Sequence, residues 1–144
     1  MERSNNVKKI SVTDAALVLI PLVMIIGAFT WMSTCGPKDD GSFMACHWAG
    51  QMVKALGCLQ LALAIVHAAS ADTKFKKGID VSLACTGALT ILTPGMLINL
   101  CQDSMMMCRA GTQPWTIVLS VLIIVAAIAD IFFTSAKADA DRHH

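Results

Sequence analysis

Sulfur-bearing side chains gather at two places in this sequence, where they could bind a metal ion or form disulfide bonds. Six cysteines are present, and four of them fall in polar surroundings: Cys35, Cys46, Cys101 and Cys108. Thiols that face an oxidising compartment form disulfides. We therefore predict two disulfides, Cys35 with Cys46 and Cys101 with Cys108, although four cysteines also allow the two pairings that link the loops.

Methionine and histidine accompany these cysteines. Met44, Cys46 and His47 fall within four consecutive residues, and a run of three methionines that includes Met106 precedes Cys108. Thioether, thiolate and imidazole groups suit Cu(I), zinc or haem iron. These five residues are thus a candidate soft-metal site for copper or haem. The competing interpretation is that the methionines dip into the membrane interface or pack against a partner protein.

A polar stripe runs along the apolar segment that follows: His47, Gln51, Lys54 and Cys58. Intervals of three or four residues place these side chains on one face of a helix. Lys54 either extends toward the aqueous surface or faces the interior or a partner, where it would hold an anion, a haem propionate or a quinone oxygen. His67, further along the segment, is interpreted as an interhelical hydrogen-bonding residue.

The elements that must position these residues are four long apolar runs. Of the 144 residues, 56% are hydrophobic and only 15% are charged, which exceeds what a small soluble core can bury. A membrane crossing needs roughly 20 apolar residues, and in lipid only a helix satisfies the backbone of a single segment. We predict one transmembrane domain, residues 1–144, that forms an all-α integral membrane four-helix bundle. The predicted spans are 15–32, 48–71, 79–100 and 115–133.

Charge asymmetry predicts the orientation of the bundle. Most positive charges fall in the termini and in the loop between the second and third spans: Arg3, Lys8, Lys9, Lys74, Lys76, Lys77, Lys137 and Arg142. Lys38 and Arg109 lie on the other side. The positive-inside rule therefore places both termini in the cytoplasm and the cysteine-containing loops outside the cell (inner) membrane. A net charge of +1 with no basic face argues against nucleic acid as a partner.

The two helical hairpins share a pattern that suggests duplication. At a period of 66 residues, Asp14 aligns with Asp80, and the hairpins close on Asp72 and Asp130. Two copies in the same orientation would be parallel repeats related by an axis along the membrane normal. The predicted repeats span about 14–72 and 80–130.

Three of the aspartates differ in what their positions imply. Asp14 and Asp80 suit helix N-termini, where a carboxylate complements the helix dipole, so we interpret them mainly as capping residues rather than as a proton relay. Asp130 is followed by apolar residues and lies deeper in its span. It is therefore a candidate functional carboxylate, because ionisable groups inside a membrane are costly.

The motif Met44-Ala45-Cys46-His47-Trp48, with Cys35-Gly36-Pro37 before it and Thr93-Pro94-Gly95 and the second cysteine pair after it, resembles an uncharacterised family. That family comprises small prokaryotic four-span membrane proteins, and the resemblance covers most of the chain. Its members often accompany, or are fused to, MacB-type ABC permeases. The resemblance implies a non-enzymatic accessory subunit whose partners are the bilayer and a membrane permease, with the outer loops as a docking or soft-ligand site.

The predicted architecture is also similar to that of quinone-linked disulfide-forming enzymes and vitamin K epoxide reductases. Those enzymes use a CxxC pair, whereas six residues separate Cys101 from Cys108 here. The alternative function is thus a thiol-disulfide oxidoreductase with quinone as cofactor. Cys101 and Cys108 would face the quinone, Cys35 and Cys46 would exchange disulfides, and Lys54 would stabilise an anion.

Overall fold

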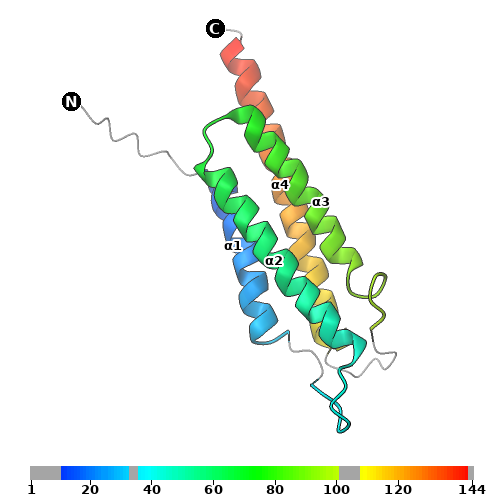
Figure 1. Cartoon of the computed structure of the whole chain (residues 1–144). Coiled ribbons are helices and arrows are strands. Elements are labelled where there is room, and N and C mark those ends of the chain that lie inside the picture. Colours follow the sequence, from blue (N-terminus) through cyan, green and yellow to red (C-terminus); the bar gives the residue numbers. More distant parts are fainter. Residues whose placement is uncertain (1–10, 33–35, 101–107, 143–144) are drawn as a thin grey trace, which may run out of the picture.

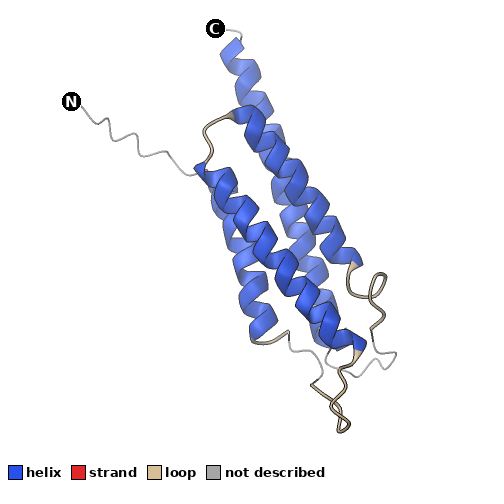
Figure 2. Cartoon of the chain, in the orientation of Figure 1, coloured by secondary structure: helices blue, strands red, loops and turns tan. Residues whose placement is uncertain are grey.

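The computed structural model describes residues 11–32, 36–100 and 108–142, and the described residues are all-helical apart from their connections (Figure 2). No strand occurs in this part of the chain. The predicted all-α class is therefore confirmed. The helices in chain order are α1 (Val12–Phe29), α2 (Ala45–Ala69), α3 (Thr73–Leu92), a short π-helix η1 (Cys108–Thr112) and α4 (Gln113–Arg142).

The four α-helices lie side by side, and each runs antiparallel to the one before it (Figure 1). α1 packs against α2 and α4, and α3 packs against the same two helices. The start of α1, the end of α2, the start of α3 and the end of α4 therefore meet at one end, which is uppermost in Figure 1. We call this the α2–α3 end, after the connection that lies there.

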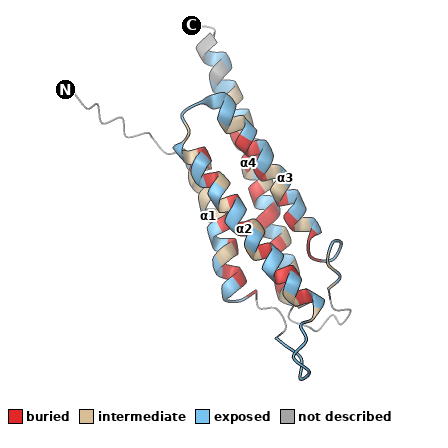
Figure 3. Cartoon of the chain, viewed as in Figure 1, coloured by how far each residue is buried: buried red, intermediate tan, exposed pale blue. Residues whose placement is uncertain are grey.

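Three helical segments are long and apolar enough to cross a membrane: Val12–Phe29, Ala45–Ala69 and Arg109–Lys137. Their outward-facing side chains are also apolar, and Leu19, Ile65 and Val125 are each more than half exposed. Figure 3 shows buried positions turned toward the neighbouring helices and exposed positions around the outside. Apolar surface on this scale suits lipid rather than water, so the chain is suited to a membrane.

Helix α3 differs from the predicted span 79–100 at both ends. It begins at Thr73 because Asp72 caps it, accepting a hydrogen bond from the backbone N–H of Lys74 at 3.0 Å. It ends at Leu92, close before Pro94, which has no N–H, and Gly95, which adopts a φ of 108°. The predicted span 79–100 therefore runs past the end of the helix.

Close approach of the helices depends on glycine at two positions. A Cβ on Gly87 of α3 would lie 2.9 Å from the Ile124 side chain of α4, and one on Gly57 of α2 would lie 3.1 Å from Ile25 of α1. Small residues at such contacts let backbones pack closely where lipid removes the hydrophobic driving force. Buried apolar side chains fill the space between the helices: Leu17, Met24, Ala28, Met32, Val53, Ala64, Ile79, Leu83, Leu119, Ile123 and Ala127.

Candidate functional site

His67 lies in the core of the structure near the α2–α3 end. His67 follows Gln60 by seven residues and Ala64 by three on α2. Because that spacing repeats one face of a helix, all three lie on the buried face of α2. Its side chain is fully buried. An imidazole at such a position needs polar partners, because an unpaired buried polar group costs about 1–3 kcal/mol.

Three aspartates from the other three helices surround the imidazole ring. Asp14 Oδ1 of α1 lies 3.1 Å from Nδ1. On the opposite side of the ring, Nε2 lies 3.0 Å from Asp80 Oδ1 of α3 and 3.3 Å from Asp130 Oδ2 of α4. All three carboxylates are buried, so every one of the four helices contributes to this cluster around the imidazole.

Lys76 completes the cluster and connects it to the surface. Its ammonium lies 3.0 Å from Asp14 Oδ1, and its side chain keeps 15% of its area exposed. Lys76 is one helical turn before Asp80 on α3, so both side chains reach the same region. We call these five residues, His67, Asp14, Asp80, Asp130 and Lys76, the His67 centre.

Only some of the polar atoms in the His67 centre form hydrogen bonds. Asp14 accepts one from Lys76 and another from the backbone N–H of Ser11 at 3.2 Å, and Asp130 accepts one from the Thr13 hydroxyl. In contrast, both ring nitrogens of His67 and both carboxylate oxygens of Asp80 lack any partner in hydrogen-bond geometry among the described residues. The short distances around the ring are therefore ion-pair contacts of 3.0–3.3 Å that are not aligned as hydrogen bonds.

The charges in the His67 centre do not cancel. With a neutral imidazole, three carboxylates and one ammonium leave two net negative charges in a buried place. Buried uncompensated charge is expensive, so the His67 centre needs additional protons on its imidazole or carboxyl groups, or a bound cation.

The described residues contain further buried polar side chains inside the helices, beyond a layer of apolar side chains. Leu17 and Leu83 are fully buried and lie one turn deeper than Asp14 and Asp80. Past them, the Gln60 amide donates a hydrogen bond to the Thr90 hydroxyl at 2.9 Å. The Gln60 carbonyl oxygen has no partner, so the core keeps an unused acceptor there.

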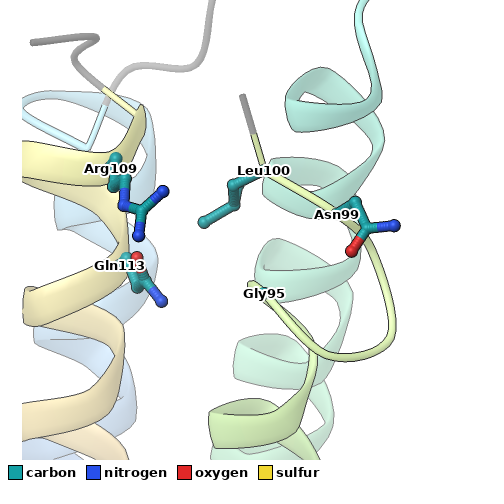
Figure 4. Close-up of a pocket in the computed structure, with 5 residues that line it drawn as sticks. All are labelled: Gly95, Asn99, Leu100, Arg109 and Gln113. Carbon is teal, nitrogen blue, oxygen red and sulfur yellow. The ribbon is translucent and has the colours of Figure 1, made fainter. Parts of the chain in front are cut away.

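The end opposite the His67 centre carries a pocket of about 370 Å³. Figure 4 shows Arg109 and Gln113 on one side of it, with Leu100 pointing toward them from the segment after α3. Gly95 and Asn99 complete the lining. Most of these side chains are exposed, and the pocket has a single charged residue in Arg109. We assign no ligand to it.

A family model for a domain of unknown function, DUF4418, matches residues 17–133. The chain belongs to the DUF4418 family. No curated protein and no solved structure matches it. The DUF4418 match includes His67, Lys76, Asp80 and Asp130, whereas Asp14 lies just before the matched stretch.

The predicted polar stripe lies away from the His67 centre. His47 is stacked on Phe43, with ring centroids 4.3 Å apart, and Lys54 lies 4.6 Å above the ring of Phe29. Gln51 and Cys58 are exposed. Lys54 is thus held by an aromatic face on α1, and the role predicted for this stripe stays a prediction.

The predicted sulfur site falls largely on residues whose side chains the structure does not describe. Cys35, Cys101 and Met106 lie outside the described residues, and only the backbone of Cys108 is placed, at the start of η1. Cys46 is buried in the first turn of α2. The predicted disulfides, the copper or haem site and the quinone-linked alternative therefore stay predictions.

Met44 caps α2 next to the buried Cys46. Cys58 of α2 and Cys85 of α3 are both exposed.

Sequence reasoning identified parts of the His67 centre without assembling it. Asp130 was the candidate functional carboxylate, and His67 does lie between helices. Asp14 receives the hydrogen bond from Ser11 that suits a helix start. The interpretation of Asp80 as a capping residue is wrong, because α3 begins at Thr73 and Asp80 lies inside it. Both aspartates contact the imidazole. The available signal was that four ionisable residues fall at the same predicted membrane side of four apolar runs.

Proposed function

We propose that this protein is a non-enzymatic membrane protein that binds a divalent first-row transition-metal cation at the His67 centre, in the service of cation transport. The observation that carries this proposal is the convergence of buried ligand atoms. One atom each from Asp14, His67 and Asp130 lie within 4.8 Å of one another. Ionisable groups at this depth in a membrane-suited chain are typical of ion pathways.

The ligand chemistry supports this class of cation. Metal–nitrogen and metal–oxygen bonds of about 2.0–2.2 Å bring ligand atoms to roughly 3.5 Å from one another around the ion. Shifts of about 1 Å or less would bring the three atoms to that separation. One imidazole with two carboxylates suits zinc, iron or manganese, whereas Ca²⁺ prefers six to eight oxygens and Cu(I) prefers sulfur. Asp80, whose two oxygens form no hydrogen bond among the described residues, would supply a fourth ligand in this proposal.

Charge balance supports a divalent ion in particular. A doubly charged cation neutralises the two net negative charges of the His67 centre, with Lys76 ionised and His67 neutral. Lys76 then competes with the metal ion, because its ammonium already forms an ion pair with Asp14 Oδ1 at 3.0 Å. An entering cation must displace this ammonium, so Lys76 opposes binding and makes it reversible.

The membrane placement is part of the same proposal. α3 would be the fourth crossing, with the lysines of its first turns extending to the lipid surface and its exposed Met96 and Leu97 continuing the apolar surface beyond its end. The positive-inside rule would put the α2–α3 end in the cytoplasm. The His67 centre would then load from the cytoplasm, past the partly exposed Lys76.

The test is metal binding by the full chain in detergent micelles, after chelation and alkylation of its cysteines. Calorimetry with Zn²⁺ and the visible spectrum with Co²⁺ should show one ion per chain at the His67 centre. His67→Asn should lower the affinity at least about tenfold, because loss of an outer-shell partner of a ligand already costs about 10–100-fold. His47→Asn, a histidine outside the centre, is the matched control and should bind as the wild type does.

A variant that should gain affinity shows that the changes in zinc binding do not result from misfolding. Lys76→Gln removes the competing charge and should raise the Zn²⁺ affinity by about tenfold, a change that a damaged fold cannot produce. Equal binding by the wild type and His67→Asn would overturn the proposal. Absence of zinc or cobalt binding to the wild type would do the same.

Association with a MacB-type permease, through docking at the outer loops, is compatible with this role and stays a prediction. Its test is separate, because it depends on the intact complex rather than on the His67 centre. The permease should co-purify with the chain under mild detergent. Its loss under those conditions would count against an accessory subunit.

A further inference from the structure

We infer that a cation bound at the His67 centre passes on through the helical core by way of a second, uncharged site formed by Gln60 and Ser120. This inference rests on the proposed function, because it takes the same divalent cation as its substrate. It adds a direction and a route, and it identifies the protein as a permeation pathway rather than a metal store.

Two buried oxygen atoms carry the inference. The Gln60 side chain is fully buried, and its Oε1 has no hydrogen-bond partner among the residues that the structure describes. The same holds for the Ser120 side chain of α4 and its Oγ. Unpartnered buried polar atoms are rare in folded proteins and call for an explanation such as a bound ion or water.

Both residues sit against the same stretch of α3. Thr90 accepts the hydrogen bond from the Gln60 amide at 2.9 Å. One turn earlier on α3, a Cβ on Gly87 would lie 3.4 Å from the backbone oxygen of Ser120. The Gln60 amide of α2 and the Ser120 backbone of α4 therefore both lie against one segment of α3.

The hydrogen bonds of Thr90 leave the Gln60 carbonyl as the available ligand. The Thr90 hydroxyl donates to the backbone oxygen of Thr86 at 2.7 Å and accepts from the Gln60 amide. These bonds hold the amide nitrogen of Gln60 against α3. The carbonyl oxygen is then the part of the side chain that is left for a cation or for the water that hydrates it.

The site lies inward from the His67 centre along the helices. Gln60 is seven residues before His67 on α2, which corresponds to about 10 Å along the axis. Ser120 is followed toward the opposite end by Thr116 and Thr112, both of which are also buried. Buried polar positions thus continue from the middle of α4 toward the end where the pocket lies.

The chemistry of the two sites suits passage from one to the other. The His67 centre offers carboxylates and binds tightly, whereas an amide oxygen and a hydroxyl are neutral ligands that hold a cation weakly. Conduction needs an entry site that binds and further sites that release. Leu17 and Leu83 lie between the two sites and are fully buried, so they set the barrier that the cation crosses.

The experiment compares binding with transport. The full chain is reconstituted in lipid vesicles that contain a zinc-sensitive dye, and Zn²⁺ uptake is followed under a membrane potential. Binding to the same preparations is measured in micelles. Gln60→Met and Ser120→Ala remove the free oxygens, while Gln51→Met and Ser82→Ala change an exposed residue of the same type on α2 and on α3.

Gln60→Met and Ser120→Ala should each lower the uptake rate at least about tenfold and leave the Zn²⁺ affinity within about twofold of the wild type. The control variants should change neither quantity. Retained binding also shows that each variant is folded, because the His67 centre needs all four helices.

The outcomes separate the two claims. Wild-type binding with no uptake above protein-free vesicles would overturn the route and leave metal binding in place. Uptake that is unchanged in both Gln60→Met and Ser120→Ala would also overturn the route. A wild-type chain that binds no zinc would overturn the proposed function together with this inference.

Discussion

Replacing Asp80 by asparagine distinguishes a metal ligand from a structural ion pair, because the two roles predict opposite changes in the stability of the metal-free protein. Asp80 Oδ1 and Asp130 Oδ2 lie 3.0 and 3.3 Å from the same nitrogen of His67, so the two oxygens are at most about 6 Å apart. At that distance, with an effective dielectric constant of about 20, two like charges repel by roughly 3 kcal/mol. Asparagine keeps the shape of the side chain and removes this repulsion.

We expect Asp80→Asn to stabilise the metal-free chain by about 1–3 kcal/mol. The lower bound allows for the attraction to Lys76 that is lost with the carboxylate. The same change should lower the zinc affinity and reduce the stabilisation that saturating Zn²⁺ provides. For scale, a ligand at 100 times its dissociation constant stabilises the folded state by about 2.7 kcal/mol.

The assay is denaturant unfolding in micelles, with and without chelator, followed by circular dichroism. Asp72→Asn is the matched control, because asparagine caps a helix about as well as aspartate and Asp72 is exposed. If Asp80 were instead half of a structural ion pair with a protonated His67, its loss would cost about 3–5 kcal/mol. A metal-free Asp80→Asn chain that is less stable than the wild type by more than about 1 kcal/mol would refute our reasoning.

Three further expectations follow from the packing of α3. Gly87→Ala should destabilise the protein by about 1–3 kcal/mol, because its Cβ would lie 2.9 Å from a side-chain carbon of α4. Gly78→Ala has open space and should stabilise the protein by about 0.5–1 kcal/mol. Changes in unfolding free energy of the same sign for both variants would contradict this. Thr90→Val should cost about 1–3 kcal/mol by stranding the Gln60 amide, and an unchanged unfolding free energy would contradict that bond. Leu83→Ala should speed zinc uptake into vesicles by about tenfold, and slower uptake at unchanged affinity would show that Leu83 is not the barrier.

The helices could be predicted from the sequence because their signals are local. Long uncharged runs indicate membrane-suited helices wherever they occur, and three of the four runs meet that description in the structure. The helix ends were harder. The predicted span 79–100 runs past Pro94, whereas the helix ends at Leu92, because the local pattern does not show whether the chain resumes its helical path after Pro94-Gly95.

The His67 centre could not be assembled from the sequence, because its contacts join residues far apart in the chain. Asp14 has a local explanation as a helix-start residue, and that explanation is correct as far as it goes. Its contact with His67 depends on how α1 is rotated against α2. Rotation is set by packing, including the glycine contacts, and no single segment encodes it.

The predicted duplication illustrates the same point. Asp14 and Asp80, which align at a period of 66 residues, both contact His67. Asp72 and Asp130, which align at the hairpin ends, do not occupy equivalent places, because Asp72 is exposed and caps α3 while Asp130 is buried in the His67 centre. The residue of α2 that lies beside Asp130 of α4 is His67, and the two side chains are in contact.

The most direct test of the central claim is the zinc X-ray absorption spectrum of the metal-loaded full chain in lipid. Binding at the His67 centre should give only nitrogen and oxygen ligands at about 2.0–2.2 Å, including one imidazole, and His67→Asn should abolish that imidazole signal. A zinc–sulfur distance of about 2.3 Å, unchanged in His67→Asn, would place the metal at the cysteines instead and contradict the account.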